Sequence, residues 1–216
     1  MRTGFRPAVV FVCIAGAISQ AAPVSINLTL DTSGLAATGA EYQLDLVLVG
    51  AANNTALFNA FDFGSGSPII NPLTDPGVTV TSSPFSVQLM NDQSAGIFGP
   101  SYTFFFTPGL NLSFDLSATN NPPPENVEAD DISIYIEDAD GNTLPTTDPS
   151  GANALMLLQL GDNNPEPQFY PGTRPPLVTR FNTAEPGSVC LLTCAGALFG
   201  VPVLISRPRR ARRRRA

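Results

Sequence analysis

Three oxygen-bearing side chains at every second position form the most ligand-like group in the sequence. Asp138, Asp140 and Asn142 have the spacing with which calcium loops present carboxylate and amide oxygens. The sixth position holds Thr143 where such a loop needs glycine, and the twelfth holds Pro149 where it needs glutamate. The Asp-Gly pair inside the group is also a strong hairpin signal. The pattern favours a hairpin alone, with a weak additional Ca²⁺ site as the alternative, and it suggests no other cofactor.

Composition limits the reactions that the chain can catalyse. The absence of His and Lys excludes His-based triads, Ser-Lys pairs and Schiff-base chemistry. Acidic residues are plentiful, but most fall in predicted turns, and the chain has no Trp to line a sugar-cleaving cleft. The phenylalanines at 104–106, with Phe61 and Phe63, are either a sugar-stacking face or core, and a sandwich without disulfides favours core. We therefore predict no enzyme and no catalytic residues.

Charge is segregated along the chain. Residues 22–183 hold 17 of the 18 acidic residues and two Arg, a net charge near −15 against −7 for the whole chain. Such a body repels nucleic acid and anionic surfaces and attracts cations. Its range contains none of the three Cys, so it has neither a disulfide nor a Cys/His zinc site. The body must be stabilised by its core, and the segregation indicates parts that occupy different compartments.

The first 21 residues have the organisation of a secretory signal peptide. Arg2 and Arg6 precede an apolar run over residues 8–18, which is followed by Ser19-Gln20-Ala21. Cleavage after Ala21 keeps Pro23 away from the scissile bond. The alternative is an uncleaved or buried helix, but the run is short for a membrane span. This segment implies signal peptidase and Sec-type export machinery as partners.

The C-terminal end combines an apolar run with a basic cluster. Residues 189–205 carry no charge, and as a helix they would cover about 26 Å, near the short limit for a bilayer core. A basic cluster directly after such a run acts as a cytoplasmic stop. Its members are Arg207, Arg209, Arg210, Arg212, Arg213, Arg214 and Arg215. The alternative is a core helix followed by a nucleic-acid-binding tail, which accounts less simply for an export signal on the same chain.

Glu185-Pro186, the apolar run and the Arg cluster together resemble the PEP-CTERM sorting signal of Gram-negative and related bacteria. The resemblance covers residues 184–216 and departs from the pattern at Ala184, where the family has a first proline. It implies processing by an exosortase-type membrane peptidase and passage from an inner-membrane intermediate to the cell surface or extracellular matrix. A literal Pro-Glu-Pro at residues 165–167 is followed by polar sequence, and we interpret it as part of a loop.

Between the two ends, apolar residues alternate with period two, which is typical of strands with one buried face. Turn residues separate the runs at intervals of roughly ten. The predicted strands cover residues 24–30, 42–49, 57–63, 78–81, 85–89, 102–106, 110–116, 132–136 and 154–160. About nine short strands without an amphipathic helix predict an antiparallel β-sandwich, jelly-roll-like in connectivity.

The predicted organisation is a signal peptide (1–21), a β-sandwich (22–161), a Pro-rich linker (162–183) and a sorting tail (184–216). Within the tail we predict a transmembrane helix at 189–205 and a cytoplasmic end at 206–216. The expected function is that of a non-enzymatic exported protein of the surface or the exopolysaccharide-associated matrix. One alternative is an adhesion module that binds carbohydrate or Ca²⁺, with extracellular polysaccharide as partner. Another is a secreted hydrolase with two facing acids in a cleft.

Overall fold

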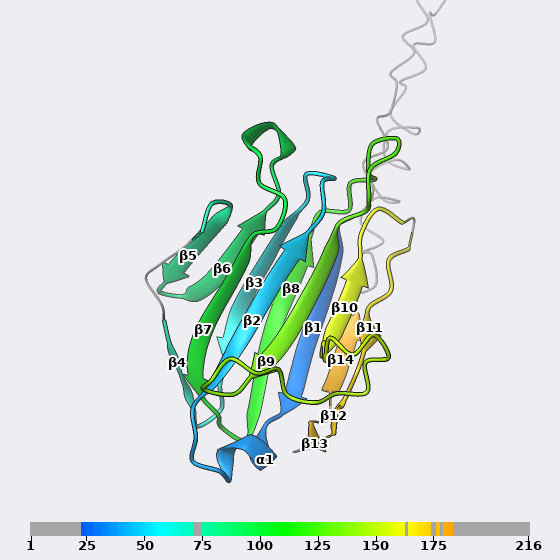
Figure 1. The fold of residues 1–216 in the computed structure, drawn as a ribbon. Coiled ribbons are helices and arrows are strands. Elements are labelled where there is room, and N and C mark those ends of the chain that lie inside the picture. The colour runs from blue at the N-terminus through cyan, green and yellow to red at the C-terminus, as the bar shows by residue number, and fades with distance from the viewer. Residues whose placement is uncertain (1–22, 71–74, 163, 174–175, 178, 184–216) are drawn as a thin grey trace, which may run out of the picture. The chain divides into compact units, whose positions relative to one another are not determined.

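The computed structural model describes residues 23–70, 75–162, 164–173, 176–177 and 179–183. These residues form two antiparallel β-sheets packed as a sandwich (Figure 1), so the predicted all-β sandwich is confirmed. Each of the nine predicted strands has a counterpart among the observed strands. Because the strands alternate between apolar and polar residues, each sheet has one face that is buried against the other sheet.

Neighbouring strands within each sheet come from distant parts of the chain. Sheet A has the order β14 (Thr179–Thr183), β1 (Val24–Asp31), β8 (Asn111–Ala118), β3 (Thr55–Asp62), β6 (Phe85–Met90) and β5 (Val78–Ser82). Sheet B has the order β11 (Gln168–Phe169), β10 (Met156–Gln159), β9 (Asp131–Glu137), β2 (Tyr42–Val49), β7 (Ser101–Thr107) and β4 (Ser67–Ile69). The short strands β12 (Gly172–Thr173) and β13 (Pro176–Leu177) pair with each other.

The core consists of the inward-facing residues of both sheets. On β2, Leu44, Leu46 and Leu48 are all fully buried, whereas the residues between them are only half-buried. Phenylalanines from both sheets fill one end of the core, and Phe104 packs edge-on against Phe85 with ring centroids 5.0 Å apart. The prediction that most of these phenylalanines are core residues therefore holds. Phe105, which points out of sheet B, is the exception.

A β-bulge in β3 brings Phe61 and Phe63 into the core. Ala56 and Phe58 point inward, so strict alternation would also turn residues 60 and 62 inward. The pairing of β3 with β8 instead shifts register between Asn59 and Asp62, and Ala60 takes a positive φ of 53°. The extra residue reverses the alternation. Phe63 is consequently 7% exposed and packs against the aromatic cluster.

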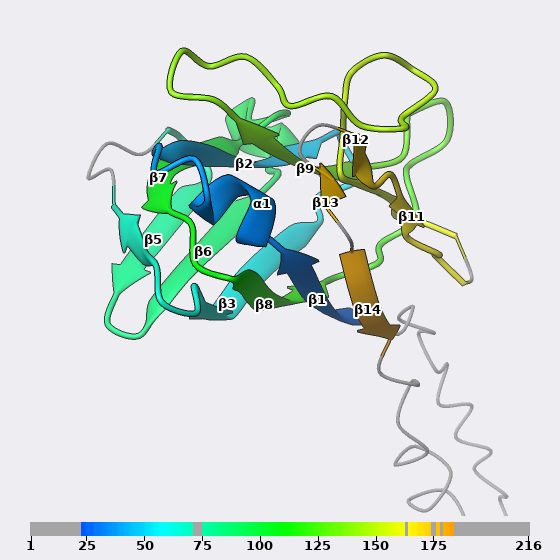
Figure 2. The same cartoon turned by 90° about the horizontal axis from the view of Figure 1, so that it is seen from below.

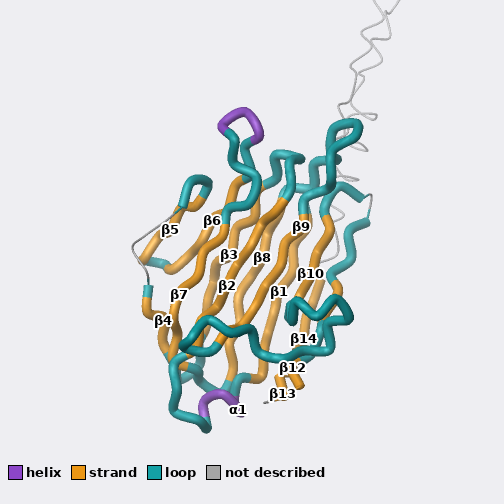
Figure 3. Tube along the Cα trace, viewed as in Figure 1, coloured by secondary structure: helices purple, strands orange, loops and turns teal. Residues whose placement is uncertain are grey.

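Two helical turns lie at opposite ends of the sandwich, α1 (Ser33–Ala36) and the 3₁₀ turn η1 (Gln93–Ala95) (Figure 3). The view from below in Figure 2 shows α1 over the end of the two sheets. Leu35 of α1 is fully buried in the core. The preceding Thr32 is also buried, and its hydroxyl donates to the carbonyl of Gly109 at 2.9 Å. This turn closes one end of the core, and the periodicity of the sequence did not predict it.

The range 162–183, predicted as a Pro-rich linker, contributes strands to both sheets. β11 pairs with β10 at the edge of sheet B, and β14 pairs with β1 along five positions of sheet A. The prolines of this range do not prevent the pairing of β14. Thr179–Thr183 contains no proline, so every residue in it can donate a backbone hydrogen bond. An edge strand with unpaired backbone groups favours such pairing.

Phe104→Ala should destabilise the fold strongly, because it opens a cavity among Phe61, Phe63 and Phe85. We expect a loss of about 3–5 kcal/mol in the free energy of unfolding, measured by urea denaturation. The matched control is the neighbouring Phe105→Ala, which removes the same ring from the outer face and should cost less than about 1.5 kcal/mol. Equal losses for the two variants would contradict the assignment of the inner face.

Candidate functional site

Both outer faces of the sandwich carry acidic side chains. Hydroxyl and amide side chains are frequent at the outward positions of sheet A, but Asp31, Asp62 and Asp115 also lie on this face. The outer face of sheet B carries Asp45, Asp131 and Glu137, and acidic loops adjoin it. Both faces can therefore attract a cation or a donor-rich ligand.

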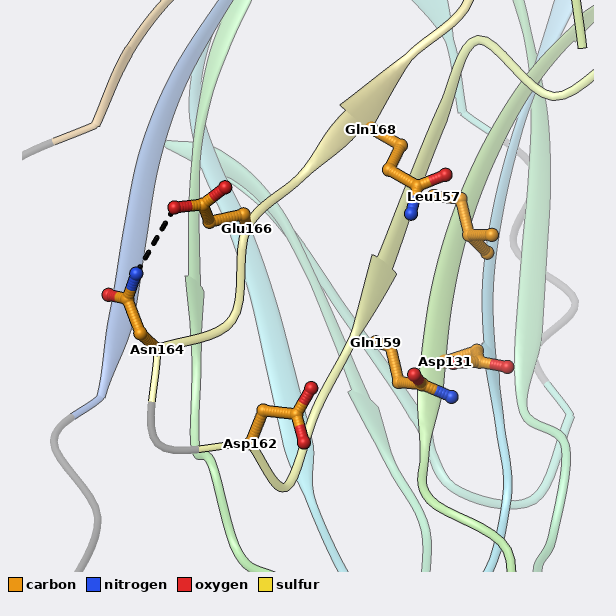
Figure 4. A pocket seen from close by; sticks show the side chains of 7 residues that line it. All are labelled: Asp131, Leu157, Gln159, Asp162, Asn164, Glu166 and Gln168. Atoms are coloured by element: carbon orange, nitrogen blue, oxygen red, sulfur yellow. Dashed lines mark hydrogen bonds between the residues drawn. The ribbon is translucent and has the colours of Figure 1, made fainter.

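A polar groove of about 300 Å³ lies at the edge of sheet B (Figure 4). It is formed by β9, β10, β11 and the loop that joins β10 to β11. The lining side chains are Asp131, Leu157, Gln159, Asp162, Asn164, Glu166 and Gln168. Three are carboxylates, three are carboxamides, one is aliphatic and none is basic. The groove can thus accept many hydrogen bonds and offers no positive charge to an anion.

Strand pairing sets two walls of the groove. Asp131 of β9 lies opposite Gln159 of β10, and Leu157 lies opposite Gln168 of β11. Because directly opposed residues in a sheet point to the same side, these four side chains face outward together. Figure 4 shows the residues of the 160–167 loop around the other side of the opening, where the amide of Asn164 donates to Glu166 at 3.2 Å.

A buried asparagine holds the turn that carries Asp162. Asn120, which is 3% exposed, accepts a hydrogen bond from the backbone N–H of Gly161. Its amide donates to the backbone carbonyl of Asp162 at 2.7 Å. Gly161 has a φ of 96°, and a β-carbon there would lie 2.8 Å from Pro123. The turn is therefore fixed from the loop between β8 and β9, far away in the sequence.

A second buried group, Asp130, positions the start of β9. Its carboxylate accepts backbone hydrogen bonds from Ala52 at 2.8 Å and Asn54 at 3.0 Å, and its carbonyl accepts from Leu160 at 2.7 Å. Gly50 allows this approach, because a β-carbon at that position would lie 2.2 Å from the carboxylate. Asp130 thus ties three loops together beside the groove and has its own hydrogen bonds satisfied.

The neighbouring Asp131 is less well satisfied. No described residue donates a hydrogen bond to its Oδ1 atom, which is buried. Burial raises the pKa of this carboxyl, and the negative charges of Asp130 and Glu128 raise it further. This oxygen therefore lacks a hydrogen-bond donor among the described residues.

The residues predicted to bind Ca²⁺ lie at the other end of β9 from Asp131. The Asp138 carboxylate accepts hydrogen bonds from the backbone N–H groups of Asp140 at 3.0 Å and Asn142 at 2.9 Å. The side-chain amide of Asn142 also donates to it at 3.1 Å. Gly141, with a φ of 83°, closes the turn. The predicted turn is present here, and Ca²⁺ binding at these residues stays a prediction.

The part of the chain that the structure describes contains no group of three or more His, Cys, Asp or Glu side chains arranged to hold a metal ion. In the same part, no helix is both long and apolar enough to cross a membrane. The predicted sorting motif Glu185-Pro186, the predicted span at 189–205 and the terminal Arg cluster lie outside the described residues, as does the signal peptide. These features remain predictions from the sequence.

Comparisons with protein-family profiles, curated proteins and solved structures found no match. The candidate site therefore depends on its own geometry.

Sequence reasoning did not identify the groove, although part of its signal is visible in the sequence. Asp162, Asn164, Glu166 and Gln168 are polar residues at alternate positions, but they fall among prolines in the range predicted to be a linker. Glu166 belongs to the upstream Pro-Glu-Pro copy, which lies in the loop before β11. Asp131 and Gln159 join them only through strand pairing across 28 positions.

Asp131→Asn should stabilise the protein at neutral pH. The pKa of Asp131 is raised in the folded state, so near this pKa the folded protein binds more protons than the unfolded chain. The stability that comes from the protonated carboxyl is present at low pH and is lost as pH rises through the folded pKa. The variant should show a higher Tm at pH 7 and a flatter stability profile upward from about pH 4. Thermal unfolding between pH 3 and pH 8 is the measurement.

Asp138→Asn is the control, because the pKa of Asp138 is shifted in the opposite direction to that of Asp131. The pKa of Asp138 is lowered, mainly by a hydrogen bond from the backbone of Asn142 and next by one from its side chain. The ionised carboxylate therefore stabilises the fold above the usual Asp pKa, and this stabilisation is lost as pH falls. This variant should lose Tm at pH 7 and little at pH 3. A fall in Tm at pH 7 for both variants would refute the account of Asp131.

Proposed function

We propose that the protein is a non-enzymatic, exported component of the cell surface or of an exopolysaccharide-associated matrix. The acidic β-sandwich would be displayed outside the cell. Residues 1–21 would direct export through signal peptidase and Sec-type machinery, and residues 184–216 would be read by an exosortase-type peptidase. We also propose that the body has jelly-roll connectivity and that residues 189–205 form a transmembrane helix before processing.

The observation that carries the proposal is the segregation of the chain into an acidic body and two apolar, basic ends. The pairing of β1 with β14 adds support, because Ile26 lies opposite Thr183 in an antiparallel register. The described body therefore begins and ends at the same end of the sandwich. A chain that leaves a domain in this way can be held from one end.

The groove favours a second candidate function, an adhesion module that binds carbohydrate. Carboxylates and carboxamides that converge on a cavity are suited to the hydroxyl groups of a sugar. This candidate is compatible with the first, because a matrix protein can be retained by the polysaccharide that it binds.

Fractionation combined with intact mass measurement tests the delivery proposal. In a host with an exosortase-type system, we expect the protein in the surface or matrix fraction, without residues 1–21 and without the tail that follows Glu185-Pro186. Replacing both motif residues by Ala should increase the share of unprocessed, membrane-associated chain. Ala184→Pro, which completes the Pro-Glu-Pro motif, should increase the processed share.

The matched control for processing is Glu166→Ala, which changes the upstream Pro-Glu-Pro copy and should leave the processed share unchanged. A tail that persists in every fraction would refute processing while leaving a membrane anchor possible. A chain that keeps its first 21 residues and stays in the cytoplasm would refute export altogether.

A further inference from the structure

The groove is built for a molecule larger than a single ion. Its volume of about 300 Å³ is at the small end of the range for organic ligands, roughly the space of one sugar unit. Among the residues that the structure describes, no three acidic side chains converge as metal ligands. The three carboxylates of the groove are therefore not gathered around a single metal position.

The charge of the groove restricts the ligand further. Asp131, Asp162 and Glu166 are acidic, and none of the seven lining side chains is basic. A uronic acid, a phosphate or a sulfate would bring negative charge to carboxylates with no cation to offset it. A protonated amine would instead supply the positive charge and strong donors, and the carboxylates of Asp162 and Glu166 are exposed to receive them.

The remaining lining residues favour a polyhydroxylated carrier for that amine. Gln159, Asn164 and Gln168 can each donate and accept, which matches hydroxyl groups that do the same. Leu157 adds an aliphatic surface against which the C–H face of a sugar ring can pack. A simple alkyl polyamine would leave these carboxamides without partners.

We propose that the groove binds an amino sugar with a free, protonated amine, as a unit of a polysaccharide. The inference rests on the proposed extracellular role, since it names the matrix polymer that such a protein would meet. The ammonium group pairs with the carboxylates, and the hydroxyl groups pair with the carboxamides.

Calorimetric titration with short glucosamine oligomers tests the proposal on the purified full chain in neutral detergent, whichever cell fraction supplied it. We expect binding that weakens with added salt. The N-acetylated oligomers should bind at least about ten-fold more weakly, because they lack the charge. Oligogalacturonate should not bind. Equal affinity for the free and acetylated oligomers, or preference for the acidic one, would overturn the proposal.

Asp162→Asn and Glu166→Gln remove groove charge from exposed side chains with little change in shape. Each should weaken glucosamine-oligomer binding by about ten-fold. Asp140→Asn makes the same charge change in the distant hairpin and should leave affinity unchanged. Equal weakening by all three variants would mean attraction to net charge alone and would refute the groove site. A non-exported protein that still binds would refute the proposed function only, whereas an exported protein that does not bind would refute this inference only.

Discussion

Burial of two facing apolar sheet surfaces is the interaction on which the rest of the structure depends. No cysteine lies between residues 22 and 183, so the body is stabilised by packing and backbone hydrogen bonds alone. Leu44, Leu46 and Leu48 supply one inner face, and Phe104 of sheet B packs against Phe61 and Phe85 of sheet A. Because strand side chains alternate, every strand that supplies the core also presents residues to solvent.

That alternation decides which outer residues can serve a function. Both sheets present carboxylates among their outward side chains, and acidic loops adjoin sheet B. The acidic side chains of Asp45 and Glu137 are held on neighbouring strands, and burial raises the pKa of each. Their folded arrangement therefore has an electrostatic cost at neutral pH, which the apolar core must offset.

Long-range polar contacts convert the sandwich edge into a shaped groove. Asn120 holds the turn at residues 161–162, and Asp130 connects the loop after β2 to the end of β10. Both side chains are buried, so a loss of either partner would leave a polar group without a hydrogen bond. Asp131 follows directly in the chain, and its burial, together with the nearby charges of Asp130 and Glu128, raises its pKa.

The sequence by itself determined the all-β class and the nine principal strands, because the period-two pattern depends only on neighbouring residues. It also revealed the segregation of charge and the turn at residues 138–142. It did not reveal β14, α1 or the bulge at Ala60, since each depends on what the rest of the fold leaves unpaired or unfilled. The groove was not predictable from the sequence either. Asp131 and Gln159 meet only through strand pairing, and the hydrogen bond from Asn120 holds the turn that carries Asp162 beside them. Local pattern determines which face of a strand is apolar, but only tertiary packing decides which strands are neighbours.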